Sequence, residues 1–142
     1  MDGWSVYEDL VGQNWAALPP DQRALVGFAS LRSEVDNGGF DQFFYNSSGD
    51  LAVEAMNASR SLHLDHVADL ICRAMELLPG GYSSDRTVRQ AALKRTERNA
   101  FWALDKEFYR LERELDFKAA INALAKSALR SVGRPGEPCE DG

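Results

Sequence analysis

The chain has 142 residues, 44% of them hydrophobic and 27% charged, which is typical of one globular domain and excludes a disordered or collagen-like chain. Its net charge of −6 disfavours a protein that binds nucleic acid through an overall basic surface. Residues 1–80 carry 12 acidic and 4 basic side chains, whereas residues 81–142 carry 10 and 12. This asymmetry suggests a surface for a basic partner, although a solvated surface that maintains solubility explains it equally simply.

The N-terminal segment predicts a helix that begins at a capping box, in which Ser5 accepts a backbone N–H and Glu8 reaches back. We expect this helix to extend to about Ala17. Pro19 and Pro20 then end it, and they suit the first turn of the following helix, where a missing N–H has no cost.

The second predicted helix has apolar residues at intervals of three and four, which form one buried stripe: Leu25, Phe28, Leu31 and Val35. Asn37-Gly38-Gly39 ends this helix, because these residues tolerate the left-handed backbone of a helix C-cap. We expect a positive φ at Gly38 or Gly39, since the chain must reverse within a few residues into a short aromatic helix from Phe40 to about Asn46.

The remaining chain also predicts helices. One is capped by Ser48 or Asp50 and ends near residue 61, and another covers 64–78. A polar segment capped by the stretch Ser83-Ser84-Asp85 extends to about residue 98. A long helix over 101–115 bends near Asp116 and continues to residue 132. The fold class is therefore all-α, with one compact multi-helix domain over 1–132 and a flexible C-terminal tail at 133–142.

The same periodicities predict which apolar side chains form the core. Ten of them are expected to be buried together: Phe28, Leu31, Phe40, Phe43, Phe44, Ile71, Phe101, Leu104, Phe108 and Leu111. Trp102 and Tyr109 lie beside this stripe, so they either widen the core face or form a contact between two copies in a homodimer.

The densest local pattern surrounds the two glycines. It is Leu31-x-x-Glu34-Val35-x-Asn37-Gly38-Gly39-Phe40-x-Gln42-Phe43-Phe44-x-Asn46-Ser47-Ser48-Gly49. The glycines permit a tight reversal, the aromatic residues pack on neighbouring helices, and the amides satisfy backbone groups at the helix ends. The structural motif that we expect here comprises Asn37, Gly38, Gly39, Phe40, Gln42, Phe43, Phe44 and Asn46.

This pattern resembles the signature of the DNA mimic protein 19 family. The flanking helical segments, from about Trp4 to Leu129, are compatible with the length and all-α fold of that family. One characterised member is an acidic dimer that imitates the charge of DNA and occupies a transcription factor. The resemblance therefore implies an acidic binding module whose partner is a basic protein, such as a DNA-binding regulator.

Seven carboxylates are candidates for the partner-binding surface: Glu34, Asp36, Asp41, Asp50, Glu54, Asp65 and Asp69. Two pairs, Asp50/Glu54 and Asp65/Asp69, have the four-residue spacing that separates Cβ atoms by about 5–6 Å on a helix. Such rows can imitate a few phosphates of B-DNA, which are about 3.4 Å apart along each strand. The alternative for Asp50 and Asp65 is that they only stabilise helix N-termini.

Catalytic and metal-binding patterns are weak. His63-x-x-His66 offers two ligands, whereas zinc sites take three or four. We therefore predict no catalytic residue, no metal, no cofactor and no enzyme activity. An immunity-type inhibitor of a toxin, and an enzyme with an unrecognised site, are the alternatives to the DNA mimic.

The expected location is the cytoplasm. No run of 18 apolar residues is present, and the first residues lack the basic start and apolar stretch of a signal peptide. Cys72 and Cys139 are too few for a disulfide framework. Neither direct nucleic-acid binding nor membrane binding is expected.

Overall fold

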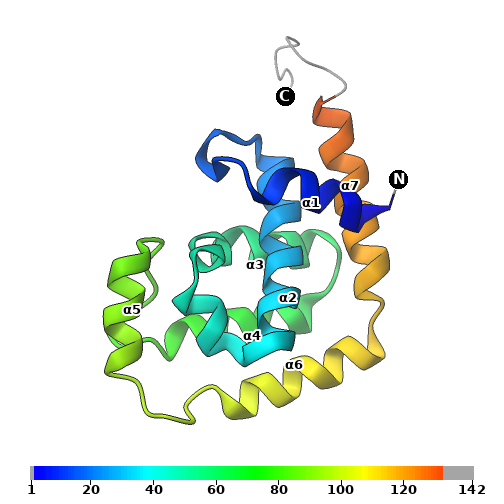
Figure 1. Cartoon of the computed structure of the whole chain (residues 1–142). Helices are drawn as coiled ribbons and strands as arrows, with labels where there is room; N and C mark the ends of the chain where they lie inside the picture. The colour runs from blue at the N-terminus through cyan, green and yellow to red at the C-terminus, as the bar shows by residue number, and fades with distance from the viewer. Residues whose placement is uncertain (1, 133–142) are drawn as a thin grey trace.

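The computed structural model describes residues 2–132, and in this range it contains helices and no strand (Figure 1). The α-helices are α1 (Gly3–Val11), α2 (Pro20–Tyr45), α3 (Ala52–Ser61), α4 (Asp65–Glu76), α5 (Arg86–Lys94), α6 (Trp102–Glu114) and α7 (Phe117–Val132). Two short 3₁₀-helices, η1 (Trp15–Ala17) and η2 (Ser47–Leu51), precede α2 and α3. The all-α prediction is confirmed, while the predicted tail at 133–142 lies outside the described residues.

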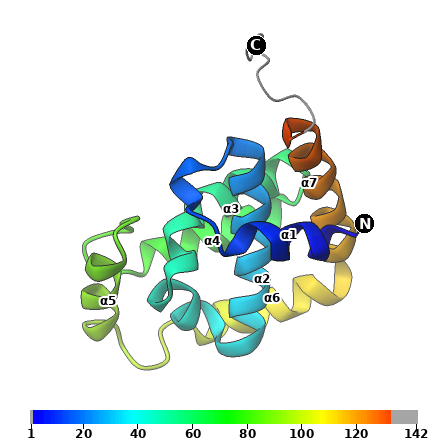
Figure 2. The ribbon, with the colours of Figure 1, turned by 45° about the horizontal axis from the view of Figure 1, so that its top comes forward.

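Helix α2 runs through the middle of the molecule (Figures 1 and 2). It packs against α1, α3, α5, α6 and α7. It begins at Pro20, as the two prolines predict. Its predicted stripe is buried, and all ten side chains predicted to form the core are at most 9% exposed. The core prediction is therefore confirmed.

Aromatic rings form a continuous chain through this core. Phe40 packs edge-on against Phe108 at 6.0 Å between ring centroids, Phe108 packs against Phe117 at 5.5 Å, and Phe117 packs against Phe28 at 5.5 Å. Edge-to-face pairs at these separations each stabilise by about 0.5–1.5 kcal/mol beyond their burial. The aromatic helix after the glycines is thus joined to α6 and α7, which are distant in sequence.

The backbone of α2 is kinked at Gly39, where φ is +79° and ψ is −178°. The predicted positive φ is confirmed. A side chain at this position would collide with the carboxylate of Asp105 on α6. That carboxylate accepts a hydrogen bond of 2.8 Å from the backbone N–H of Phe40, so α6 supplies the acceptor that the kink removes from the helix.

Two predicted helix starts are wrong. Asp2 caps α1 by accepting from the N–H of Ser5 at 2.9 Å, so α1 begins before the predicted capping box. Glu8 instead accepts the indole N–H of Trp4 at 2.9 Å. Neither Ser48 nor Asp50 caps α3, because both side chains are engaged elsewhere, as described below. The N-cap residue is Leu51, which has no polar side chain to cap the helix.

Two predicted helix ends also differ. Helix α1 ends at Val11 and the chain re-forms only the short turn η1 before α2, because Gly12 follows directly and has little helical preference. Helix α5 is capped by Asp85 as predicted, but it ends at Lys94 rather than near residue 98. The bend near Asp116 is confirmed, with α7 beginning at Phe117.

No helix among residues 2–132 combines the length and the apolar content needed to cross a lipid bilayer.

Candidate protein-interaction surface

Glu34 lies at the centre of a set of polar side chains contributed by the glycine pattern. Its carboxylate accepts hydrogen bonds from Gln42 at 2.6 Å, from Asn46 at 3.1 and 3.3 Å, and from Ser48 at 3.2 Å. Asn37 in turn donates to the side-chain oxygen of Gln42 at 3.3 Å. We call these five residues the Glu34 network. They join the two parts of α2 on either side of the kink to η2.

The Glu34 network explains why the glycine pattern contains so many amides. A partly buried carboxylate requires several donors to replace its lost water, and here three side chains supply them. Glu34 was a candidate for partner binding, but both of its oxygens already accept hydrogen bonds within the chain. Its observed contacts are those of a residue that stabilises the kinked segment.

Arg89 on α5 is a second buried charge on the same side of α2, and the sequence reasoning missed it. Its side chain is fully buried and donates to the carbonyl oxygens of Phe44 at 2.8 Å, Asn46 at 2.9 Å and Ser83 at 3.1 Å. Gly49 permits this approach, since a Cβ there would lie 2.8 Å from Nε of the arginine. A signal was available: Arg89 precedes the buried Ala92 by three residues, so it lies on the inner face of the predicted helix.

Two more of the candidate carboxylates are paired with arginines. Asp50 lies 2.8 Å from Nη2 of Arg89, although Oδ1 accepts no aligned hydrogen bond, so the contact is an ion pair. Glu54 lies 3.7 Å from Nε of Arg23. The predicted Asp50/Glu54 row is therefore partly neutralised by basic groups of the same chain.

The remaining α2 carboxylates lie beside α6. Residues two apart on an α-helix differ by about 200° in direction, so Asp36 faces away from the Glu34 network. Burial, together with the neighbouring carboxyl group of Glu112, raises the pKa of Asp36 to about 7. Nε of Arg32 lies 2.7 Å from Glu112 and 4.0 Å from Asp36, which opposes this rise in pKa.

Beyond the kink, the charge of Asp41 acts on Asp105, which like Glu112 belongs to α6. Burial raises the pKa of Asp105, the N–H of Phe40 lowers it, and the charge of Asp41 raises it further. Tyr109, between Asp105 and Glu112 along α6, donates to the carbonyl oxygen of Val35 at 2.9 Å and holds the two helices together. We call Asp36, Asp41, Asp105 and Glu112 the acidic patch.

Half of the acidic patch was missing from the sequence prediction. Asp105 and Glu112 belong to the second half of the chain, where basic residues balance the acidic ones and conceal them in a charge count. Their spacing of seven residues places both on one side of α6. That spacing was visible in the sequence, but only the packing of α6 against α2 relates it to Asp36 and Asp41.

Asp65 and Asp69 are exposed on α4 and lie beside the opposite side of α6. On that side, Glu107 pairs with Arg110 of its own helix, and the charges of Arg73 and His66 on α4 further lower its pKa. Among the described residues, Asp41, Asp65 and Asp69 have no basic side chain within ion-pair distance. The structure thus brings Asp36 and Asp41 together with carboxylates of α6, while Asp65 and Asp69 form a separate row.

The two candidate metal ligands, His63 and His66, are both exposed. Within residues 2–132, no three histidine, cysteine or carboxylate side chains are grouped so that they could hold a metal ion. The exposed indole of Trp102 is covered on one face by Lys106, whose Nζ lies 3.8 Å from the ring centroid. Tyr109 is only partly exposed, so the two residues do not form the open aromatic patch that a dimer contact would favour.

Comparison with known proteins supports the family that the glycine pattern indicates. The family model described as DMP19-like protein matches residues 16–129, which include α2, the Glu34 network and all four residues of the acidic patch. No similar protein was found among curated proteins or among solved structures. Because the match covers most of the 142 residues, the chain belongs to the DMP19-like protein family.

Proposed function

We propose that this protein is an acidic binding module that occupies the DNA-binding surface of a transcription regulator or another DNA-handling protein. The observation that carries the proposal is the acidic patch, in which two adjoining helices present carboxylates and Arg32 is their one counter-charge among residues 2–132. Membership in the DMP19-like family supports the same function, since the family resemblance implies DNA mimicry.

The spacing of the patch is compatible with a short stretch of DNA backbone. Asp105 and Glu112 are seven residues apart on α6, which corresponds to about 10.5 Å along the helix. Three successive phosphate steps of one B-DNA strand cover about the same length, at about 3.4 Å each. Asp36 and Asp41, on α2, add a second row beside the first.

The row on α4 forms a second negative area, beside the other side of α6. Asp65 and Asp69 are exposed and four residues apart, so their Cβ atoms are about 5–6 Å from each other. Surfaces of this kind increase the rate of association with a basic partner and select against acidic ones. The modest net charge of −6 fits a local imitation of DNA rather than an imitation over the whole surface.

The proposal is tested with a partner recovered by pull-down from the host and identified by mass spectrometry. Its affinity is measured at increasing salt, between about 0.05 and 0.5 M NaCl, with free DNA as a competitor. Binding to exposed carboxylates weakens steeply over this range, because charges are screened beyond about 8 Å at 0.15 M. We expect DNA to displace the protein from its partner.

A matched pair of charge-reversed variants locates the surface. Asp41→Lys/Asp69→Lys removes two exposed carboxylates from the negative surface, and Asp9→Lys/Glu97→Lys changes the net charge equally at exposed positions elsewhere. The first variant should lose at least about tenfold in affinity and the second less than about twofold. An affinity that is insensitive to salt, or a partner that remains bound in excess DNA, would contradict DNA mimicry and favour an immunity-type inhibitor.

A further inference from the structure

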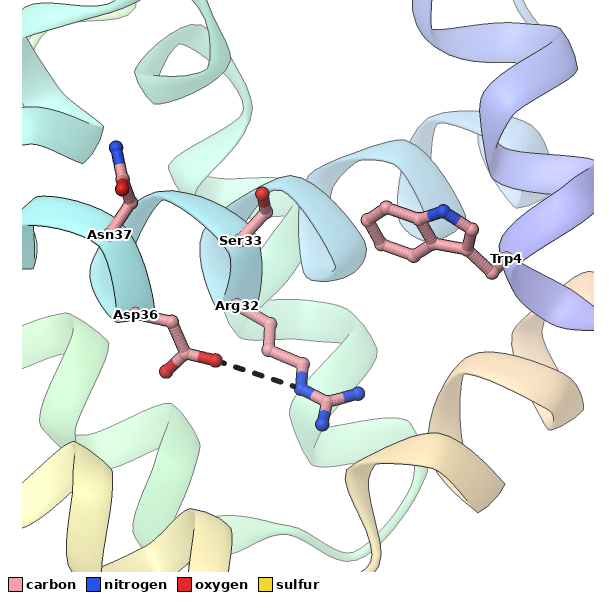
Figure 3. Close-up of a pocket in the computed structure, with 5 residues that line it drawn as sticks. All are labelled: Trp4, Arg32, Ser33, Asp36 and Asn37. Atoms are coloured by element: carbon pink, nitrogen blue, oxygen red, sulfur yellow. Dashed lines mark ion pairs between the residues drawn. The ribbon is translucent and has the colours of Figure 1, made fainter.

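A hollow of about 380 Å³ lies on the surface between the start of α1 and the middle of α2 (Figure 3). It is lined by Trp4 from α1 and by four residues of α2: Arg32, Ser33, Asp36 and Asn37. In Figure 3 the indole of Trp4 extends toward α2, and Asp36 and Arg32 leave α2 on the same side. The hollow therefore adjoins the acidic patch through Asp36.

The indole of Trp4 is exposed yet fixed in orientation. It is 42% exposed, although its N–H donates to Glu8 at 2.9 Å and its ring lies 4.7 Å from that of Tyr7 between centroids. A ring restrained in the free protein loses little entropy when a ligand packs on it. Trp4 thus offers a preorganised aromatic surface at one side of the hollow.

The charges around the hollow favour a cationic ligand. Arg32 is the basic group of the lining, and its closest acidic partner is Glu112, outside the hollow, at 2.7 Å. The distance from Arg32 to Asp36 is 4.0 Å, so Asp36 is only loosely paired with it. Glu8 beside the indole adds a further negative charge.

We propose that this hollow is an anchor site for one arginine side chain of the protein partner, with the guanidinium packed on Trp4 and bonded to Asp36. A guanidinium is planar, stacks on aromatic rings and presents parallel N–H donors to a carboxylate. The ammonium of lysine also donates to a carboxylate, but it is a compact point charge without a planar face. Ser33 and Asn37 supply further acceptors at the rim. The inference rests on the proposed function, because it names the residue that the basic partner would insert.

The direct test uses a blocked Gly-Arg-Gly peptide and the same peptide with citrulline, which has the shape of arginine without its charge. The indole N–H signals of the protein are followed by two-dimensional NMR during the titration. We expect the signal of Trp4 to shift saturably with the arginine peptide and not with the citrulline peptide. Trp102 is the internal control, since Lys106 already covers its ring. An equal response to citrulline, or no shift at Trp4, would overturn the proposal.

Two variants test the two halves of the site. Trp4→Leu removes the stacking surface and Asp36→Asn removes the charge, and each should weaken peptide binding by about five- to tenfold. Trp102→Leu, at an indole that is 60% exposed, should leave it unchanged. If Trp4→Leu disturbs the fold, Asp36→Asn at an exposed side chain still decides the result. Unchanged binding by both variants would refute the site.

Proton coupling supplies a second readout. The groups that face Asp36 are Arg32 on its own helix and Glu112 and Tyr109 on α6. Since the pKa of Asp36 is raised to about 7 and a guanidinium binds the ionised carboxylate, affinity for the arginine peptide should increase from pH 6 to pH 8, and Asp36→Asn should remove the increase. A pH-independent affinity in the unmodified protein would contradict the proposed bond to Asp36.

The outcomes separate this site from the proposed function. A host partner that competes with DNA but binds Trp4→Leu as tightly as the unmodified protein would overturn the anchor site and leave the proposed function intact. A specific response of Trp4 to arginine, without any partner that competes with DNA, would support the site and contradict DNA mimicry.

Discussion

Both sides of α2 near its kink contain carboxylates and an arginine, but these charged groups have different neighbours on the two sides. On the side of η2 and α5, Glu34 meets three donors and Arg89 meets three carbonyl oxygens and Asp50. On the side of α6, carboxylates face carboxylates in the acidic patch, with Arg32 as a counter-charge. A charge whose partners all come from its own chain stabilises the fold. Asp36, which is 4.0 Å from Arg32, and Asp41, which has no basic partner among residues 2–132, retain the capacity to bind another molecule.

Removing Arg89 should cause the largest loss of stability, because its side chain makes several hydrogen bonds and an ion pair on the side of η2 and α5. Arg89→Ala would remove a donor from three carbonyl oxygens, of which that of Asn46 would keep the N–H of Gly49, and would leave Asp50 without its counter-charge. Each hydrogen bond from a charged group contributes about 1.5–3 kcal/mol, so the loss of all three should cost about 3–5 kcal/mol or more. Urea unfolding measures the loss, with Lys94→Ala, at an exposed position of the same helix, as the control. A loss below about 1 kcal/mol would mean that water replaces the guanidinium.

Gly39→Ala should destabilise the protein at the kink of α2, which lies between the two sides. The new Cβ would require a strained backbone at φ +79° and would collide with the Asp105 carboxylate. Strain of this kind costs about 1–3 kcal/mol, to which the displacement of Asp105 is added. Thermal unfolding should show the loss, while Gly12→Ala, where a Cβ meets nothing within 4 Å, should be neutral or stabilising. Equal stabilities of the two variants would disprove the strain.

Glu34→Gln should have a moderate effect, since it preserves the shape of the Glu34 network and removes its charge. Asn46 and Ser48 would donate to an amide rather than to a carboxylate, and Gln42 would meet a competing donor. Hydrogen bonds to charged groups contribute about 1.5–3 kcal/mol, against about 0.5–1.5 kcal/mol for neutral ones, so a loss of about 1–2 kcal/mol is expected. Chemical denaturation measures this loss. Asp69→Asn, at an exposed carboxylate without an ion pair, should change stability by less than about 0.5 kcal/mol.

The acidic patch should reveal itself in the pH dependence of stability. The pKa of Asp36 is raised to about 7 in the folded protein from an ordinary value of 3.8. Between these values the folded state binds more protons than the unfolded state, so this group makes stability decrease as pH rises from about 4 to about 7. Asp36→Asn should reduce that decrease, because the amide donates to Glu112 at every pH. Urea unfolding of both proteins at pH 5 and pH 8 provides the measurement, and identical pH dependences would contradict the raised pKa.

Much of the fold could be predicted from the sequence because its causes are local. The stripe from Leu25 to Val35, the prolines before α2 and the reversal at the glycines depend on spacing and backbone preference within a few residues. Predictions failed where a polar side chain had two possible partners. Ser48 and Asp50 suit a helix cap locally, but they are engaged by Glu34 and by Arg89, which is 39 residues beyond Asp50 in the chain.

The candidate surface was harder to predict for the same reason. A count of acidic residues along the chain grouped Glu34 with Asp36, which face opposite sides of α2, and omitted Asp105 and Glu112. Whether a carboxylate is already bonded within the chain depends on distant contacts. The N–H of Phe40, for example, donates to Asp105 at a sequence separation of 65 residues. Periodicity predicts the direction of a side chain from its own helix, but not the charge of the helix that packs beside it.

The hydrogen bond between the N–H of Phe40 and Asp105 makes this amide a reporter of helix docking. Most amides inside a helix are protected from solvent exchange by a carbonyl four residues earlier, whereas this one is protected by a side chain of α6. Its hydrogen–deuterium exchange should therefore follow the departure of α6 from α2, without global unfolding. Slower exchange when a partner is bound would indicate that the partner holds α2 and α6 together.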